Sequence, residues 1–121
     1  MVHEKRRRYV VIHVSSPDGV GKGLLINLIR GCTRELSRED FERVKPWFVY
    51  YNKGWAIIRT WHRGSSDLMG IIENLNGREL KEGVLKMNIA GVSGTLRSAF
   101  YKFVPEKVRE GTHYREDQTK P

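Results

Sequence analysis

The residues best placed to do chemistry in this sequence follow its first hydrophobic stretch. The segment Ser16-Pro17-Asp18-Gly19-Val20-Gly21-Lys22-Gly23 separates a β-branched run from an amphipathic run, where a phosphate-binding loop would stand. A triphosphate-binding loop needs glycine in place of Ser16 and a magnesium-binding hydroxyl in place of Gly23. The sequence therefore does not predict a nucleotide triphosphatase. Two interpretations of Lys22 stay open: a contact to a phosphate backbone at a helix start, or a cation in a plain glycine-rich connector.

Other groups capable of catalysis are scattered along the chain. The histidines lie far apart and have no helical metal-ligand spacing: His3, His13, His62 and His113. Cys32 falls on an apolar helix face, which is typical of a core residue. Ser93 and Thr95 stand beside glycines with no general base near them in sequence, as in a helix cap. The acidic clusters at 35–42 and 79–82 occupy surface-like segments. We therefore expect no catalytic residue, metal site or bound cofactor in this chain.

Cations and aromatic residues gather in three segments that suit contact with a nucleic acid. The first is Lys5-Arg6-Arg7-Arg8, which is long enough to lie along phosphates. The second is the aromatic stretch 47–61 with its neighbouring arginines, because aromatic side chains beside Arg on a sheet face can stack bases. The third is 91–97, where small residues precede a helix start and a cation. We predict RNA contacts at Arg6, Arg7, Arg8, Lys22, Arg59, Arg63, Ser93, Gly94, Thr95, Arg97 and Lys102.

The tryptophans of the aromatic stretch have a second interpretation. Large aromatic residues in a small domain often build the core or a contact with another protein. We favour that interpretation for Trp47, Trp55 and Trp61. With the phenylalanines of the last predicted helix, the predicted protein-contact residues are Trp47, Trp55, Phe100 and Phe103.

Hydrophobic periodicity predicts the elements that must position these residues. The expected order is a strand over 9–14, a helix over 21–36, strands over 47–51 and 55–61, a helix over 67–75 capped by Ser65 or Ser66, a strand over 84–90 and a helix over 96–104 capped by Thr95. Arg30 and Arg34 fall away from the apolar face of the first helix, toward water or a ligand. Residues 37–46 are a charged connection ended by a proline, 91–94 are a tight turn, and the chain after Pro105 is a frayed tail.

The first six elements follow the split β-α-β-β-α-β order of an α+β, ferredoxin-like or RRM-like sandwich. We expect a four-stranded antiparallel sheet with two helices on one face and a C-terminal helix besides. The other face is left free for a ligand or for that third helix. The expected domains are a basic arm over 1–8, one RRM-like domain over 9–104 and a charged tail over 105–121.

The composition of the chain limits the classes of binding partner and the compartment that we expect. The chain of 121 residues carries 22 Lys and Arg against 14 Asp and Glu, a net charge of +8, which indicates a polyanionic partner. A single cysteine excludes an internal disulfide and fits a reducing compartment. The start of the chain has no secretory signal, and no apolar run is long enough to cross a bilayer. We therefore expect a cytoplasmic protein with no membrane contact.

Four stretches resemble the ribonuclease P protein component 2 family of archaea and eukaryotes. They are Arg8-Tyr9-Val10-Val11 after a basic start, Lys45-Pro46-Trp47, Gly54-Trp55-Ala56-Ile57-Ile58-Arg59-Thr60, and Gly91-Val92-Ser93-Gly94-Thr95-Leu96-Arg97 leading into 99–103. The last is the most specific and resembles the family's Gly-Thr-Ile-Arg signature, with Leu96 in the aliphatic place. The likeness covers about residues 6–104. The glycine-rich segment 19–23 is a departure, since the family does not require it.

The resemblance implies a function that composition alone does not show. Ribonuclease P removes the 5′ leader of precursor tRNA, and its RNA subunit carries the active site and the Mg²⁺ ions. This family supplies a protein cofactor with an RRM-like fold, which pairs with ribonuclease P protein component 3 and binds the catalytic domain of the RNA. The resemblance also allows a homodimer within a heterotetramer, and implies that precursor tRNA is met only indirectly.

Two other functions stay open from the residues. A general RRM-like RNA binder of another ribonucleoprotein would stack bases on both central strands, and the first strand offers only Tyr9 and His13. A ferredoxin-like sensor domain would bind a small molecule between subunits and has no need of so large a positive charge.

Overall fold

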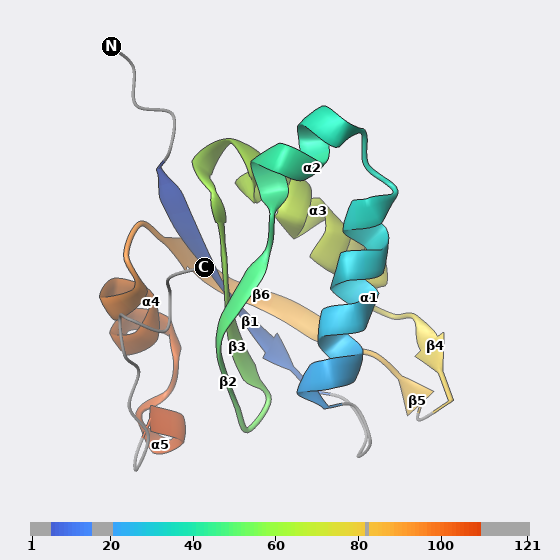
Figure 1. The fold of residues 1–121 in the computed structure, drawn as a ribbon. Helices are drawn as coiled ribbons and strands as arrows, with labels where there is room; N and C mark the ends of the chain where they lie inside the picture. The colour runs from blue at the N-terminus through green and yellow to red at the C-terminus, as the bar shows by residue number, and fades with distance from the viewer. Residues whose placement is uncertain (1–5, 16–20, 82, 110–121) are drawn as a thin grey trace.

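The strands and helices follow the β-branched and amphipathic segments of the sequence (Figure 1). The computed structural model describes residues 6–15, 21–81 and 83–109. In chain order the elements are β1 (Arg7–Val14), α1 (Lys22–Arg34), α2 (Arg38–Val44), β2 (Trp47–Asn52), β3 (Trp55–Trp61), the 3₁₀ turn η1 (His62–Gly64), α3 (Ser65–Leu75), β4 (Glu79–Leu80), β5 (Gly83–Val84), β6 (Met87–Ser93), α4 (Leu96–Phe103) and α5 (Glu106–Arg109).

The main sheet has the strand order β2-β3-β1-β6, and every neighbouring pair is antiparallel. β1 lies inside the sheet, where Val10, Val11 and Ile12 are fully buried. A strand buried on both faces reads as a continuous apolar run, which is the pattern of 9–14. The prediction of an α+β fold with a four-stranded antiparallel sheet is confirmed.

Each face of the sheet carries its own core. On one face Val10 and Ile58 pack with Leu25 and Ile29 of α1 and with the apolar stripe of α3. The opposite face of the same strands packs against α4 and its flanks, through Tyr9, Val11, Val49, Ile57, Leu96, Ala99, Phe100 and Val104. Figure 1 shows α4 on the side of the sheet away from α1 and α3. Of the two expectations for this second face, the third helix therefore occupies it and encloses much of its apolar surface.

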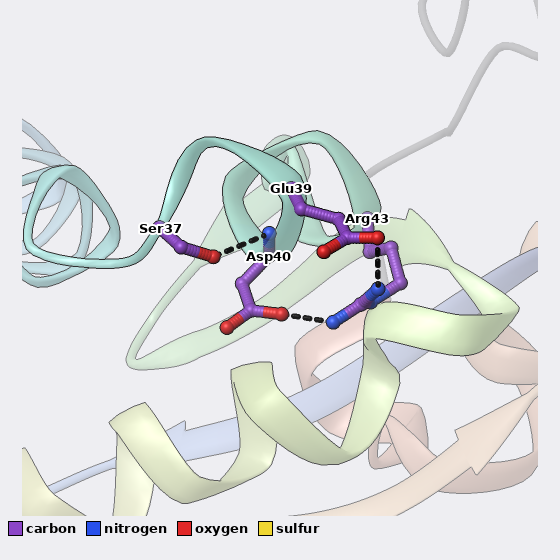
Figure 2. A network of polar contacts seen from close by, with 4 residues as sticks. All are labelled: Ser37, Glu39, Asp40 and Arg43. Atoms are coloured by element: carbon purple, nitrogen blue, oxygen red, sulfur yellow. Dashed lines mark hydrogen bonds and ion pairs between the residues drawn. The ribbon is translucent and has the colours of Figure 1, made fainter.

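The connection over 37–46, expected to be a charged loop, contains the short helix α2. Ser37 caps this helix, because its Oγ accepts a hydrogen bond from the backbone N–H of Asp40 at 3.1 Å. Arg43 forms ion pairs with Asp40 and Glu39 one turn earlier (Figure 2). A helix of seven residues is stabilised by such local contacts and by packing, because it is too short to form on propensity alone.

The glycine-rich segment 91–94, expected to be a tight turn, continues β6 as far as Ser93. The pairing of β1 with β6 shifts register between Val11 and Ile12, which marks a bulge beside Gly91. A side-chain carbon at Gly91 would lie 2.2 Å from the ring of Phe103 on α4. Gly91 therefore allows α4 to pack closely on a strand. Sequence alone does not distinguish this role of a glycine from its role in a turn.

Part of each expected tail belongs to a strand or a helix. Arg7 and Arg8, assigned to the basic arm, belong to β1, and residues 1–5 of that arm lie outside the described residues. After Pro105 the chain forms α5, whose Val108 backbone oxygen accepts a hydrogen bond from Asn52 Nδ2 at 3.1 Å. The tail beyond 109 is outside the described residues. Across 6–15, 21–81 and 83–109, no helix has the length and apolar character needed to cross a bilayer.

Candidate nucleic-acid interface

The antiparallel register brings cations that are far apart in sequence to one end of the sheet. Arg7 at the start of β1 lies opposite Trp61 at the end of β3, and Tyr9 lies opposite both Arg59 and Ser93. The turn η1 and the N-terminus of α4 follow directly from those strand ends. We define the basic end as the six arginines gathered there: Arg6, Arg7, Arg8, Arg59, Arg63 and Arg97.

The first part of the basic end joins the start of β1 to η1. The backbone N–H of His62 donates a hydrogen bond to the carbonyl oxygen of Arg6 at 2.6 Å, which holds the two segments together. The Arg7 guanidinium lies over the ring of Trp61, 5.8 Å from its centroid. Arg6 and Arg63 are exposed. This arrangement presents guanidinium groups to solvent from a backbone fixed by the sheet.

The second part is the junction between β6 and α4. Ser93 Oγ accepts a hydrogen bond from the Thr95 N–H at 3.3 Å, and Thr95 Oγ1 accepts one from the Ser98 N–H at 3.1 Å. The predicted Thr95 cap is therefore confirmed. A side-chain carbon at Gly94 would lie 3.4 Å from Arg8 Nη1, so this junction and β1 are neighbours. Gly94, Thr95 and Arg97 are exposed, as a contact with an extended ligand requires.

A cavity of about 470 Å³ opens beside the basic end. Its walls come from the last turn of α1, from α2, from the start of β2 and from the end of β3. No acidic residue among the described ones lines it. Its lining contains four cationic residues: Arg30, Arg34, Lys45 and Arg59. The indole rings of Trp47 and Trp61 lie at the same cavity. Its lining thus combines positive charge with aromatic surface.

Arg59 is the most enclosed cation of this group. Its side chain belongs to β3, only 8% of the residue is exposed, and Nη1 has no hydrogen-bond partner among the described residues. Burial, and secondarily the positive charge of Arg7, lower the pKa of Arg59. An unsatisfied buried donor costs about 1–3 kcal/mol, and more where the group is charged. A buried guanidinium in this condition favours an anionic partner at that atom.

Two predicted contact residues, Lys22 and Lys102, are not part of the basic end. Lys22 begins α1, which runs 13 residues to Arg34, so Lys22 stands about 18 Å from the cavity end of that helix. Lys102 is exposed near the end of α4, with its Nζ 5.8 Å from the Phe103 ring centroid. Neither lysine is among the residues of the basic end or of the cavity lining.

The four predicted protein-contact residues also separate. Trp47 is 39% exposed at the edge strand β2. Trp55 lies at the far end of β3, where its ring stacks on His13 with centroids 4.5 Å apart. Phe100 is 2% exposed and belongs to the core beneath α4, while Phe103 is half-buried against Gly91. Of these, Trp47 has the most exposed ring, whereas Phe100 is a core residue and is not accessible to another protein.

Sequence reasoning placed Arg30 and Arg34 toward water or a ligand but did not include them, or Lys45, among the predicted contact residues. The first two are one turn apart on the polar side of α1, and that spacing was the available signal. Lys45 ends α2 in a left-handed conformation with φ 32°, a detail that required knowledge of the helix. Within the described ranges, no cluster of three His, Cys, Asp or Glu side chains could hold a metal ion.

Comparison with known proteins shows which family the chain belongs to. No protein-family model matches the chain. Ribonuclease P protein component 2 of Methanocaldococcus jannaschii is 31% identical over 101 residues, which span 83% of this chain and 74% of that protein. A chain in the cryo-EM structure of yeast ribonuclease MRP has the same fold with a TM-score of 0.61, at 16% identity and 80% coverage of both chains. By its identity to the archaeal protein over most of both lengths, the chain belongs to the ribonuclease P protein component 2 family.

Proposed function

We propose that the chain is a protein subunit of ribonuclease P, and that it binds and stabilises the catalytic RNA for removal of the 5′ leader from precursor tRNA. Membership of the component 2 family supports this role, and the fold shared with a chain of yeast ribonuclease MRP is consistent with a ribonucleoprotein. The order β2-β3-β1-β6 supports the ferredoxin-like form of the fold. The RNA holds the active site and the Mg²⁺ ions, and this chain binds neither metal nor cofactor.

The basic end is the observation that carries this proposal. Its arginines come from the start of β1, from β3, from η1 and from α4, yet the register holds them at one end of the sheet. Acidic side chains of α2 nearby are engaged with other cations, since Asp40 and Glu39 pair with Arg43. A set of cations fixed in this way neutralises several phosphates of a folded RNA and releases their counterions.

Stabilisation follows from differential binding. Repulsion between crowded phosphates disfavours the compact conformer of an RNA. Cations held at fixed positions lower this repulsion more in the compact conformer than in extended ones. Binding therefore shifts the RNA equilibrium toward the active conformer. The RNA should therefore reach this conformer at a lower Mg²⁺ concentration when the protein is bound.

The protein partner proposed here is ribonuclease P protein component 3, and the proposed location is the cytoplasm. The ring of Tyr101 on α4, which is 50% exposed, suits a contact with another protein. Precursor tRNA is met through the assembled enzyme rather than by this chain alone.

The structure argues against the general RRM-like alternative. Base stacking in that class uses the open face of the two central strands. Here α4 covers that face, and Tyr9 and Ile57 are 5% and 0% exposed. Bases therefore have no access to the positions that such a binder uses.

Reconstitution tests the proposed function. The chain is mixed with component 3 and ribonuclease P RNA, and the cleavage rate of precursor tRNA is measured across a Mg²⁺ series. We expect half-maximal cleavage at a lower Mg²⁺ concentration when this chain is present than when it is left out. An unchanged Mg²⁺ requirement would remove the proposed stabilising role, and cleavage by the protein without RNA would contradict the division of labour.

A further inference from the structure

The cavity beside the basic end has a rigid frame. Trp47 is the first residue of β2 and pairs with Arg59, so the outer edge of β3 beyond that pair carries no strand. Thr60 Oγ1 donates a hydrogen bond to the carbonyl oxygen of Val44, and both residues are buried. A side-chain carbon at Gly64 would lie 2.1 Å from the Arg43 oxygen, so α2 also packs tightly on η1. These contacts fix α2 and the start of β2 at an uncovered sheet edge.

The charges around the cavity leave a positive excess within it. Glu39 and Asp40 of α2 pair with Arg43, and Figure 2 shows these three side chains turned toward one another. Glu42 pairs with Lys45, whose Nζ lies 2.9 Å from Glu42 Oε1. The remaining cations of the lining, Arg30, Arg34 and Arg59, have no carboxylate partner among the described residues. The lining of the cavity therefore includes three arginines that have no carboxylate partner among the described residues.

Arg59 supplies a donor that the protein does not satisfy. The residue is 8% exposed, and its Nη1 is buried and without a hydrogen-bond partner among the described residues. Guanidinium groups match the oxygens of a phosphate through parallel N–H donors. A phosphate bound in the cavity would offer the Arg59 guanidinium a hydrogen-bond acceptor that the described residues do not supply.

The aromatic part of the lining selects among anions. Trp47 is 39% exposed, and Trp61 is half-buried at the same cavity. A volume of about 470 Å³ lies within the ordinary range for small-molecule sites, roughly 300–1,000 Å³. Bases stack on such rings independently of sequence. An acidic peptide would satisfy Arg59 but would leave the exposed indole of Trp47 without a stacking partner.

We propose that this cavity binds one unstacked nucleotide of an RNA strand, with its phosphate at Arg59, Arg30 and Arg34 and its base against Trp47 or Trp61. The assignment rests on the proposed function, because the nucleotide belongs to the RNA that the basic end holds. It adds a defined single-nucleotide subsite to a contact that is otherwise electrostatic. Such a subsite anchors the strand at one point while the basic end neutralises the phosphates beside it.

Calorimetric titration of the full chain tests the subsite with four probes: a single-stranded RNA trinucleotide, adenosine monophosphate, inorganic phosphate and a glutamate-rich peptide. We expect the trinucleotide to bind with one site, and adenosine monophosphate to bind more weakly but at least tenfold more tightly than inorganic phosphate. Equal affinity for inorganic phosphate and the nucleotides would overturn the role of the tryptophans. Tighter binding of the peptide would overturn the choice of ligand, and equal binding of mononucleotide and trinucleotide would overturn its origin in an RNA strand.

Variants locate the binding. Trp47→Ala and Arg34→Gln change exposed side chains of the lining, so they keep the test valid even where Arg59→Gln fails to fold. Each should weaken trinucleotide binding by roughly tenfold, a typical effect of losing one stacked base. Val84→Ala and Arg38→Gln are the controls, because both residues are exposed and outside the lining. Trinucleotide affinities unchanged by the cavity variants, or lowered equally by the controls, would overturn the subsite.

Binding of the complete ribonuclease P RNA separates this inference from the proposed function. An RNA that binds the wild-type chain and Trp47→Ala equally, with no trinucleotide binding, would overturn the subsite while the proposed function stands. A chain that binds the trinucleotide at the cavity but not the complete RNA would overturn the proposed function, and with it the RNA origin of the nucleotide.

Discussion

Arg59 on β3 lies directly opposite Trp47 on β2 and directly opposite Tyr9 on β1. Cross-strand partners share one face of a sheet, so the arginine stands in a row with an aromatic residue on either side. This row explains how Arg59 can be only 8% exposed although Arg6, Arg63 and Arg97 of the basic end are exposed. It also joins the cavity to the basic end, since Arg7 and Trp61 form the next pair on the same face of these two strands.

The contact between Gly91 and Phe103 predicts a large effect from one methyl group. A side-chain carbon at Gly91 would lie 2.2 Å from the Phe103 ring, which holds α4 on the sheet. We expect Gly91→Ala to lower the free energy of unfolding by about 1–3 kcal/mol, as overpacking does. The measurement is urea denaturation followed by circular dichroism.

Gly70→Ala is the matched control for that substitution. Gly70 lies on α3, is exposed, and would place its new carbon with nothing within 4 Å. Alanine there should raise the free energy of unfolding by about 0.5–1 kcal/mol, because it reduces the freedom of the unfolded chain. Equal stability of the two variants would contradict the close packing of α4 on β6.

The Thr60 hydroxyl should be needed to hold α2 over the sheet. Thr60→Val keeps the shape of the side chain but leaves the buried Val44 carbonyl without its donor. We expect a loss of about 1–3 kcal/mol in the free energy of unfolding, together with faster amide hydrogen exchange in α2. Thr60→Ser retains the hydroxyl and should keep α2 protected. Comparable exchange in α2 for Val and Ser would show that this hydrogen bond does not hold the helix.

The Thr95 cap should set the stability of α4. Thr95→Ala removes the acceptor of the Ser98 N–H and should cost about 1 kcal/mol of unfolding free energy. Thr95→Ser keeps an oxygen at the same place and should lose much less. Thermal denaturation of both variants measures the difference, and a serine variant as unstable as the alanine variant would assign the effect to the lost methyl group instead.

Elements with strong periodicity were predictable from the sequence. The β-branched run at 9–14 became β1, and the three-and-four spacing from Leu24 to Leu36 produced α1 within two residues of its expected ends. Both patterns reflect burial that is local in sequence. The predictions for 37–46 and 91–94 were wrong for opposite reasons. The charged residues over 37–46 indicated a loop, but they form the short helix α2. The glycines over 91–94 indicated a turn, but Gly91 lies in a strand and leaves room for the Phe103 ring.

The candidate site was less predictable, because its geometry depends on tertiary pairing. Arg59 is recognisable as a cation in a strand, but its burial follows from Trp47 and Tyr9 on neighbouring strands. The cavity brings residues of α1 together with the end of β3, and their closeness depends on where α2 packs. The spacing of Arg30 and Arg34 predicted only that they lie outside the core, and it did not identify what they contact.

The salt dependence of binding to ribonuclease P RNA tests the central claim most directly. The variant Arg6→Gln, Arg63→Gln, Arg97→Gln removes three exposed cations of the basic end. The control Lys53→Gln, Arg78→Gln, Lys81→Gln makes the same change in net charge at exposed positions away from the basic end.

Affinity of the wild-type chain and of both variants is measured across a monovalent salt series at constant Mg²⁺. Each lost phosphate contact flattens the slope of log affinity against log salt by roughly 0.7–0.9, so the basic-end variant should lose about 2 from the slope and the control should keep it. Equal slopes for the two triple variants would contradict a phosphate-binding basic end.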